Sequence, residues 1–391
     1  MISSRADNDR VRDRGFMAEA IQLARRGLYS TDPNPRVGCL LVKDDRIVGR
    51  GWHRYAGEAH AEVDALAQAG SAARDATAYV TLEPCCHYGR TPPCSRALIE
   101  AGIARVVIAT ADANPQVAGQ GIAQLQAAGI ETSLGLLEAE AAALNAGFLR
   151  RMRGDRPFVR VKIAASVDGR TAMQSGESQW ITAGPARADV QRLRARSSAI
   201  ITGIGTLLED NPSLTVRPSE MGDLDENASP RTQPCRVVLD SGLRTPPVAK
   251  MLQAEGRTVI LCRQSNPSAS EDAGKSERRT MLEAAGAEVT ELPGRAGESG
   301  LTWPAIVEWL QTQPFNEVLI EAGATVAGSA ITAGIVDELW LYQAPTLLGS
   351  RGRPLAELPF DHMAQQQRLT VLDRRQLGAD TRTIFSLRAS A

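Results

Sequence analysis

Residues 81–94 read TLEPCCHYGRTPPC, and they bring three cysteines and a histidine close together in a chain with six Cys and four His in all. Cys85 follows a proline at the end of a predicted strand over 76–84, and Cys94 follows two prolines at the start of a predicted helix over 92–102. The free N–H groups and the dipole of a helix N-terminus stabilise a thiolate. The segment therefore predicts a metal site between a strand end and a helix start.

The third ligand is expected upstream, where His60-Ala61-Glu62 opens a predicted helix over 60–70. Residues i and i+2 do not share a helix face, so His60 is expected at the helix tip, where the chain can redirect it. Zinc deaminases combine one His and two Cys ligands with a Glu that follows in H-x-E and moves protons without binding the metal. We therefore predict one Zn²⁺ per chain, held by His60, Cys85 and Cys94, with Glu62 as the catalytic acid–base.

The cysteine spacing departs from the usual deaminase pattern, because the chain has C-x8-C between Cys85 and Cys94 where C-x2-C is usual. Cys86 is expected to be a bystander, since neighbouring residues of an extended segment point in opposite directions. The main alternative is a structural zinc site. Such a site would close its fourth position, for instance with His87, and would have no use for Glu62.

Around this segment helical and strand patterns alternate, which is typical of an α/β layered domain. Helices are predicted at 13–28, 60–70, 92–102 and 121–130, a hairpin at 39–53, and strands at 76–84 and 103–110. The segment GFLRRMRGDRPF (147–158) breaks the alternation, and a second α/β series follows it. We therefore predict two domains, 1–153 and 154–391, with polar surface loops at 218–234 and 264–279.

Length and charge limit the function classes. The chain has 391 residues, which suits two cores, and its formal net charge is −1. Such a balance provides no field for holding a polyanion, so we expect small-molecule partners and no nucleic acid. No apolar run is long enough for a membrane span and the first residues are charged, so we expect no membrane partner, no secretory signal and a cytoplasmic location. We also expect a homo-oligomer.

The glycines of the second domain do not form the dinucleotide fingerprint. Gly203-Ile204-Gly205 is followed by Leu208 where the last glycine of G-x-G-x-x-G should stand. The segment EAGATVAG (321–328) predicts a strand that turns through glycines into a helix, whose free N–H groups can hold a pyrophosphate. A helix of small residues packed on a sheet fits the same segment.

With these motifs and DANPQVAGQG (112–121), the chain resembles the bifunctional deaminase–reductases of riboflavin biosynthesis. The resemblance covers about residues 16–385 and includes PNPRVG (33–38), KIAASVDGRTAMQSGESQWIT (162–182) and TGIGTLLEDNPSLTVR (202–217). It implies a cytidine-deaminase-like α/β/α layered N-terminal domain and a dihydrofolate-reductase-like α/β C-terminal domain. The first would hydrolyse the 2-amino group of a diaminopyrimidine ribosyl phosphate with Zn²⁺, and the second would reduce the ribosyl group to ribityl with NADPH.

The resemblance also implies substrate contacts in the deaminase. The matching loops offer base and phosphate contacts at Asn34, His53, His87, Arg90, Asp112 and Asn114. Arg90 is the best candidate for the phosphate, because a guanidinium binds phosphate in a fork. DANP stands at 112–115 where the family pattern has DPNP, which keeps the polar residues and implies only a loop adjustment.

For the reductase, the family match implies two sets of contacts. NADPH contacts are expected at Ala164, Trp180, Thr206, Asp210, Ser241, Gly323, Ala324, Thr325, Val326, Ala327, Gly328 and Ser329. Substrate contacts are expected at Lys162, Ser178, Arg194, Leu214, Arg217 and Glu321. Lys162 is a candidate to polarise the substrate carbonyl, and Trp180 would equally suit a core position. Arg244 or Arg263, near strand ends, is a candidate for the 2′-phosphate of NADPH.

Two other functions fit part of the sequence. A base or transfer-RNA deaminase with an unrelated C-terminal domain would need a basic face and a C-x2-C loop. A non-enzymatic, zinc-stabilised binding module would need four ligands and no role for Glu62. Metal content and ammonia release separate these possibilities.

Overall fold

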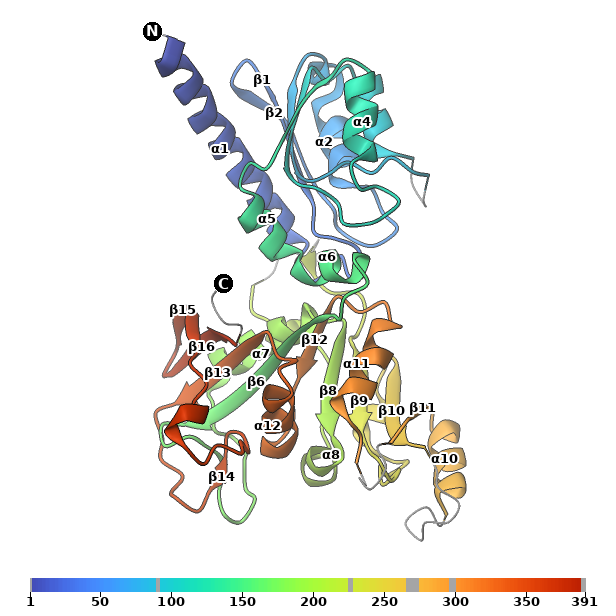
Figure 1. Cartoon of the computed structure of the whole chain (residues 1–391), viewed down its shortest axis with the longest axis vertical. Coiled ribbons are helices and arrows are strands. Elements are labelled where there is room, and N and C mark those ends of the chain that lie inside the picture. Colours follow the sequence, from blue (N-terminus) through green and yellow to red (C-terminus); the bar gives the residue numbers. More distant parts are fainter. Residues whose placement is uncertain (1, 89–91, 224–227, 265–273, 295–299, 388–391) are drawn as a thin grey trace. The chain divides into compact units, whose positions relative to one another are not determined.

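The structure is a computed structural model, and it describes residues 2–88, 92–223, 228–264, 274–294 and 300–387. The chain forms two compact units, shown in Figure 1. The first comprises Met1–Asp155 with Leu224–Pro230, and the second comprises Arg156–Asp223 with Arg231–Ala391. Among the described residues, no helix combines the length and the apolar character that crossing a bilayer requires.

The described part of the first unit holds a five-stranded sheet in the order β2-β1-β3-β4-β5. Its strands are β1 (Gly38–Lys43), β2 (Arg46–Trp52), β3 (Thr77–Leu82), β4 (Arg105–Thr110) and β5 (Glu131–Leu134). β1 and β2 form the predicted hairpin, and its turn places Asp44 and Asp45 at φ 51° and 58°, as a type I′ turn requires. β3, β4 and β5 run parallel, so their carboxyl ends meet at one edge.

Helices cover both faces of this sheet and make a three-layer α/β/α unit (Figure 1). α1 (Ile2–Arg26) and α5 (Glu138–Leu144) pack on one face, and α2 (Ala61–Ala69), α3 (Cys94–Glu100) and α4 (Gln120–Ala127) pack on the other. A further short helix, α6 (Ala146–Met152), follows α5. The prediction of a first helix over 13–28 was wrong at its start, because the polar first half of α1 has no apolar stripe for a periodicity argument to detect.

In the described part of the second unit, nine strands form a sheet in the order β11-β10-β9-β8-β12-β6-β13-β16-β15. They are β6 (Phe158–Ser166), β8 (Ala199–Gly203), β9 (Cys235–Leu239), β10 (Thr258–Arg263), β11 (Glu288–Leu292), β12 (Glu317–Ile320), β13 (Glu338–Ala344), β15 (Thr370–Leu377) and β16 (Asp380–Ser386). The strands from β11 to β13 are parallel, and β16 and β15 add an antiparallel end. β7 (Arg170–Ala172) and β14 (Arg353–Pro354) form a separate pair.

Both faces of this second sheet are covered as well, which confirms the predicted α/β class (Figure 1). α11 (Trp303–Gln311) and α12 (Ala324–Thr332) cover one face, and α7 (Gly184–Ala195), α8 (Ile204–Asp210), α9 (Lys250–Gln253) and α10 (Lys275–Ala284) cover the other. Of the predicted loop 264–279, residues 265–273 lie outside the described residues, and the prediction was wrong from Lys275, where α10 begins. Lys275 is buried and its ammonium donates to the Arg263 carbonyl, so a polar residue there belongs to a packed helix.

Candidate functional site

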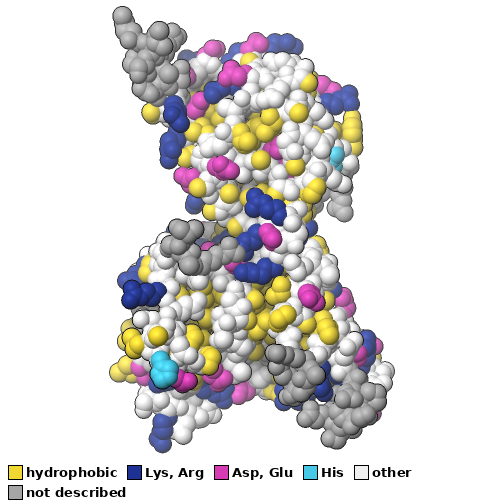
Figure 2. Space-filling model, in the orientation of Figure 1, with side chains coloured by type: hydrophobic (Ala, Val, Ile, Leu, Met, Phe, Trp, Pro, Cys, Tyr) yellow, Lys and Arg dark blue, Asp and Glu magenta, His cyan; other side chains and the backbone are white. Residues whose placement is uncertain are grey.

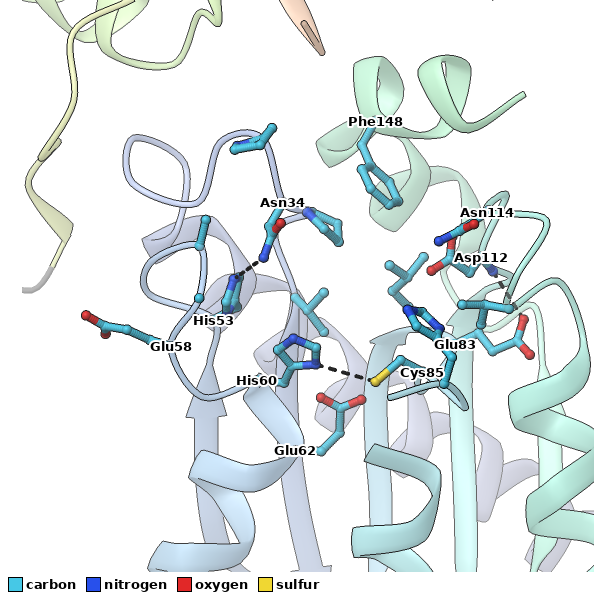
Figure 3. A pocket seen from close by; sticks show the side chains of 18 residues that line it. Asn34, His53, Glu58, His60, Glu62, Glu83, Cys85, Asp112, Asn114 and Phe148 are labelled. Carbon is cyan, nitrogen blue, oxygen red and sulfur yellow. Dashed lines mark hydrogen bonds between the residues drawn. The ribbon is translucent and has the colours of Figure 1, made fainter. Parts of the chain in front are cut away.

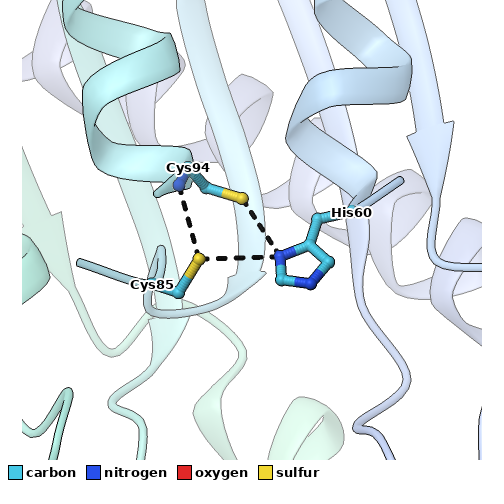
Figure 4. Close-up of side chains that lie close together, drawn as sticks. All are labelled: His60, Cys85 and Cys94. Atoms are coloured by element: carbon cyan, nitrogen blue, oxygen red, sulfur yellow. Dashed lines mark hydrogen bonds between the residues drawn. The ribbon is translucent and has the colours of Figure 1, made fainter. Parts of the chain in front are cut away.

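Three side chains from separate elements of the first unit meet in one cluster (Figure 4). His60 is the N-cap of α2 and has extended backbone angles, so the helix geometry does not set the direction of its side chain. Cys85 follows β3, and Cys94 is the first residue of α3. The His60 Nδ1 lies 3.2 Å from Cys94 Sγ and 3.5 Å from Cys85 Sγ, and the ligand atoms all lie within 4.8 Å of one another.

This arrangement fits a zinc ion in both geometry and donor chemistry. Ligand atoms held at about 2.0–2.3 Å from a tetrahedral ion lie roughly 3.5 Å from each other, and nitrogen and thiolate sulfur are the donors that zinc prefers. His87 is not a member of the cluster among the described residues, so the structure does not place it as a fourth ligand. Three protein ligands are typical of a catalytic zinc site rather than a closed structural one.

The electrostatic environment of the cluster favours a bound cation, because it stabilises a thiolate at Cys85. The hydrogen bond from Cys94, together with His60, lowers the pKa of the Cys85 thiol to about 4 despite partial burial. The Cys94 backbone N–H also donates to the Cys85 sulfur over 3.3 Å. Cys86 lies elsewhere, and its thiol donates to the Gln116 carbonyl over 3.4 Å. The structure therefore separates the two adjacent cysteines as the sequence predicted.

Glu62 lies beside this cluster and faces the same cavity, which has a volume of about 470 Å³ (Figure 3). The side chain belongs to the first turn of α2 and is buried. Burial, with the Cys85 thiolate nearby, raises the pKa of the Glu62 carboxyl to about 7. A carboxyl with a pKa near neutrality can both accept and deliver a proton at physiological pH.

One wall of the cavity carries Asn34 and His53, and hydrogen bonds fix the state of the histidine ring (Figure 3). His53 Nδ1 lies 3.0 Å from the Ala59 carbonyl, which only accepts, so Nδ1 carries the proton. The Nε2 atom of the neutral ring then accepts from the Asn34 amide over 3.0 Å. Burial lowers the pKa of His53, which favours this neutral form. The pair therefore offers a fixed, uncharged polar surface to a ligand.

The opposite wall carries Asp112 and Asn114 (Figure 3), and His87 also lines the cavity. Burial raises the pKa of Asp112 to about 6, and its carboxylate accepts the backbone N–H of Asn114 over 2.8 Å. The Nδ1 atom of His87 is buried without a hydrogen-bond partner in the described structure, which marks it as a group that a ligand can satisfy. Arg90, the predicted phosphate contact, lies outside the described residues.

Glu83 holds the Asp112 wall in place, and the sequence analysis missed it. Its buried carboxylate accepts backbone N–H groups of Asp112, Gly119, Gly121 and Ile122 over 3.0–3.3 Å. A Cβ atom on Gly121 would lie 2.1 Å from the Pro84 carbonyl, so only glycine fits there. Because Glu83 directly precedes Pro84-Cys85, one residue links the metal-binding loop to the opposite wall of the cavity. The role of Glu83 could not be predicted from sequence, because its burial and its N–H partners depend on contacts between distant segments.

A second cavity, of about 990 Å³, lies in the second unit at the carboxyl ends of β6, β12, β8 and β9. Open α/β sheets commonly bind ligands at this edge. The predicted residues that line it are Lys162, Ala164, Ser178, Trp180, Arg194, Thr206, Asp210, Leu214, Arg217, Glu321, Gly323, Ala324, Thr325 and Val326. Those that do not line it are Ser241, Ala327, Gly328 and Ser329. The predicted 2′-phosphate candidates Arg244 and Arg263 also lie outside its lining.

A buried ion pair occupies the β6–β12 end of this cavity. The Arg194 guanidinium donates to both carboxylate oxygens of Glu321, over 2.6 and 3.0 Å, and Lys162 lies 3.9 Å from the same carboxylate. Burial opposes the charge on Glu321, but Arg194 and Lys162 outweigh it and lower the pKa of that carboxyl. Burial also lowers the pKa of Lys162. Two cations therefore share one anion, which leaves net positive charge for an anionic ligand.

The glycine-rich turn after β12 has two parts with different environments. Gly323 caps the N-terminus of α12, and its backbone N–H donates to the Thr206 hydroxyl over 3.1 Å. Further along the helix, Ala327 is fully buried, and a Cβ on Gly328 would lie 2.0 Å from the Glu357 carbonyl. The start of EAGATVAG thus faces the cavity, while its end packs against the protein. The prediction of a phosphate-binding turn thus suits the start of this segment, and the alternative of a packed helix of small residues suits its end.

Two family descriptions match the chain. Residues 157–382 match the RibD C-terminal domain. Residues 10–110 match the zinc-binding region of cytidine and deoxycytidylate deaminases. The match over 157–382 contains the 990 Å³ cavity, and the match over 10–110 contains the cluster of His60, Cys85 and Cys94.

Relatives and solved structures combine both halves. The riboflavin biosynthesis protein RibD of Escherichia coli (strain K12) is 47% identical over 374 residues, covering 95% of this chain and 98% of the relative. RibD of Haemophilus influenzae is 43% identical, covering 95% and 96%. The structure of Acinetobacter baumannii RibD matches with a TM-score of 0.84 at 44% identity, covering 97% of this chain and 99% of that one. A deaminase/reductase from Thermotoga maritima matches with a TM-score of 0.80 at 30% identity, covering 97% and 99%.

Proposed function

This chain belongs to the RibD family of bifunctional riboflavin-biosynthesis enzymes, and from that premise we propose how its residues divide the two reactions. The enzyme is a zinc-dependent deaminase and an NADPH-dependent reductase. Its substrates are 2,5-diamino-6-(5-phosphoribosylamino)pyrimidin-4(3H)-one for deamination and 5-amino-6-(5-phosphoribosylamino)uracil for reduction. Residues 1–153 carry the deaminase and residues 154–391 the reductase. A deaminase with an unrelated C-terminal domain is not supported, since 157–382 match the RibD C-terminal domain.

The observation that carries the deaminase assignment is the three-ligand cluster with a buried carboxyl beside it. His60, Cys85 and Cys94 would hold one Zn²⁺, whose Lewis acidity makes water a nucleophile near neutral pH. Glu62 accepts the proton of the attacking water at a carboxylate oxygen and delivers it to the departing amine nitrogen. Its buried position beside the three ligands, facing the cavity, suits both halves of this transfer.

The walls of the same cavity would orient the pyrimidine ring and its phosphate. The neutral His53–Asn34 pair offers amide and ring contacts on one side. His87, Asp112 and Asn114 offer polar groups on the other, held by Glu83. Arg90 is the proposed phosphate contact. Fixing the ring between two polar walls aligns the amine-bearing carbon with the nucleophile, which is how positioning contributes to rate.

In the second cavity, NADPH would lie with its pyrophosphate at the start of α12, where backbone N–H groups are unpaired by the helix. Cofactor contacts are proposed at Ala164, Trp180, Thr206, Asp210 and the cavity-facing part of 323–329. The aminouracil would bind near Lys162, Arg194 and Glu321, with Ser178, Leu214 and Arg217 as further contacts. The protein orients the two reactants, because the cofactor itself carries the hydride chemistry.

Arg217→Ala tests the reductase assignment. The Arg217 side chain is half-exposed at the cavity and pairs with Glu220 over 2.7 Å. Losing a charge-assisted bond to the ribosyl phosphate should lower kcat/KM for the aminouracil by about 10- to 100-fold. The absorbance change on NADPH oxidation measures this kcat/KM, and Glu220→Gln is the matched control. Unchanged kcat/KM in Arg217→Ala would remove Arg217 from the substrate site.

Small molecules are the partners of both sites, and we propose a homo-oligomer that binds neither nucleic acid nor membrane and works in the cytoplasm. β15 ends the reductase sheet, and large apolar side chains are exposed on or before it. Figure 2 shows that hydrophobic side chains are scattered over the visible face of the protein. They are Leu347, Leu358, Phe360, Met363, Leu369, Val371 and Leu372. An open strand edge with apolar neighbours favours pairing with a second copy. Light scattering that gives a monomer mass at micromolar concentration would contradict the oligomer.

A further inference from the structure

Among the described residues that line the reductase cavity, one cationic side chain has no partner within the protein. The six described cationic residues of the lining are Lys162, Arg187, Arg194, Arg217, Lys250 and Arg353. Five have partners. Lys162 and Arg194 face Glu321, Arg217 pairs with Glu220, Arg353 pairs with Glu209, and Arg187 lies over the Trp180 ring. In the described part of the chain, the Lys250 side chain has no ion pair, ring contact or hydrogen bond, so its charge is available to a ligand.

The backbone fixes where Lys250 starts. Its N–H donates to the Asn211 side-chain oxygen over 2.9 Å, and Asn211 is the left-handed C-cap of α8. Ala249 and Met251, on either side of Lys250, are both buried in the core of the unit. Their burial anchors the first turn of α9 and leaves the Lys250 side chain exposed at the cavity. The backbone of Lys250 is therefore fixed, and its long side chain can extend into the cavity.

The place of Lys250 along the sheet indicates what it meets. The cavity runs across neighbouring strands in the order β6, β12, β8, β9. Lys162 lies on β6, Gly323 follows β12, and Lys250 follows β9. A pyrophosphate at the start of α12 would thus have Lys162 and Glu321 on one side and Lys250 on the other. The nicotinamide must reach the substrate near Lys162, so the adenosine half extends toward Lys250.

We propose that Lys250 binds the 2′-phosphate of NADPH and sets the preference for NADPH over NADH. This rests on the proposed cofactor orientation in the second cavity. A free ammonium at the adenosine end distinguishes the two cofactors, because they differ only in that phosphate. Arg244, by contrast, is largely exposed outside the cavity and lies 4.0 Å from Asp240.

Titration calorimetry on the full chain with NADP⁺ and NAD⁺, which bind without turnover, tests the assignment. Lys250→Met should weaken NADP⁺ binding by about 10- to 100-fold, the loss expected for one charge-assisted contact, and leave NAD⁺ binding unchanged. Lys250→Arg should restore most of the NADP⁺ affinity. Arg244→Met, a matched loss of one cation nearby, should bind both nucleotides as the unaltered chain does.

Two outcomes overturn the proposal. One is an unchanged ratio of NADP⁺ to NAD⁺ affinity in Lys250→Met, whether or not both nucleotides bind more weakly, and the other is loss of that ratio in Arg244→Met instead. If the unaltered chain binds neither nucleotide, the cofactor assignment itself fails, and that failure is separate from the role of Lys250. Unchanged NAD⁺ binding in each variant reports that the unit holding the second cavity remains folded.

Discussion

Glu62→Gln should abolish most ammonia release while the protein keeps its zinc and its fold. The amide has nearly the shape of the carboxyl but cannot accept the proton of water, so general acid–base catalysis is lost. The expected fall in kcat is on the order of 100-fold or more. The buried position beside His60 and Cys85, facing the cavity, is the structural reason to expect so large an effect.

The matched control is Asp64→Asn, two residues further along α2. Asp64 pairs with Arg54 over 3.0 Å and does not line the deaminase cavity. Its substitution should leave ammonia release close to normal. Near-normal turnover in Glu62→Gln, measured with zinc content confirmed by elemental analysis, would remove Glu62 from the mechanism.

Cys85→Ser and Cys94→Ser should each lose bound zinc. Each removes one of three ligands, and a serine hydroxyl is a poor replacement because it is not ionised at neutral pH and is a weaker zinc donor than thiolate. Both variants should therefore release no measurable ammonia. Elemental analysis after dialysis gives the zinc per chain.

Cys86→Ser is the control for this pair, since Cys86 is adjacent in sequence but points to the Gln116 carbonyl. It should retain one zinc per chain and most of the deaminase activity. Zinc loss in Cys86→Ser with zinc retained in Cys85→Ser would reverse the ligand assignment. NADPH oxidation by all three variants reports whether the reductase unit remains folded.

The metal cluster could be predicted from sequence because its signals are local. Prolines before Cys85 and Cys94, and Gly70 at the end of α2, mark where each element starts or stops. The sequence places His60 and Cys94 at the N-terminal ends of two helices. Side chains at helix ends can come together, so the two were expected to be close. The residues that the structure brings together are the ones expected, and their catalytic roles remain predictions.

Other features depend on contacts between distant segments, and no local pattern reveals them. Glu83 matters because four backbone N–H groups from 112–122 converge on it. Lys250 differs from the other cations that line the second cavity because, in the described part of the chain, its side chain has no partner. The glycines of EAGATVAG looked alike in sequence, but Gly323 faces the cavity and Gly328 permits close packing on Glu357.

One pair of parallel assays tests most directly whether the two sites work independently. Glu62→Gln is supplied with 5-amino-6-(5-phosphoribosylamino)uracil in one assay and with 2,5-diamino-6-(5-phosphoribosylamino)pyrimidin-4(3H)-one in the other, and NADPH absorbance and ammonia are followed in both. We expect NADPH oxidation at close to the normal rate in the first assay, with ammonia release nearly absent in the second. Loss of NADPH oxidation in the first assay, in a folded Glu62→Gln protein, would contradict the account, because it would mean that both reactions depend on one site.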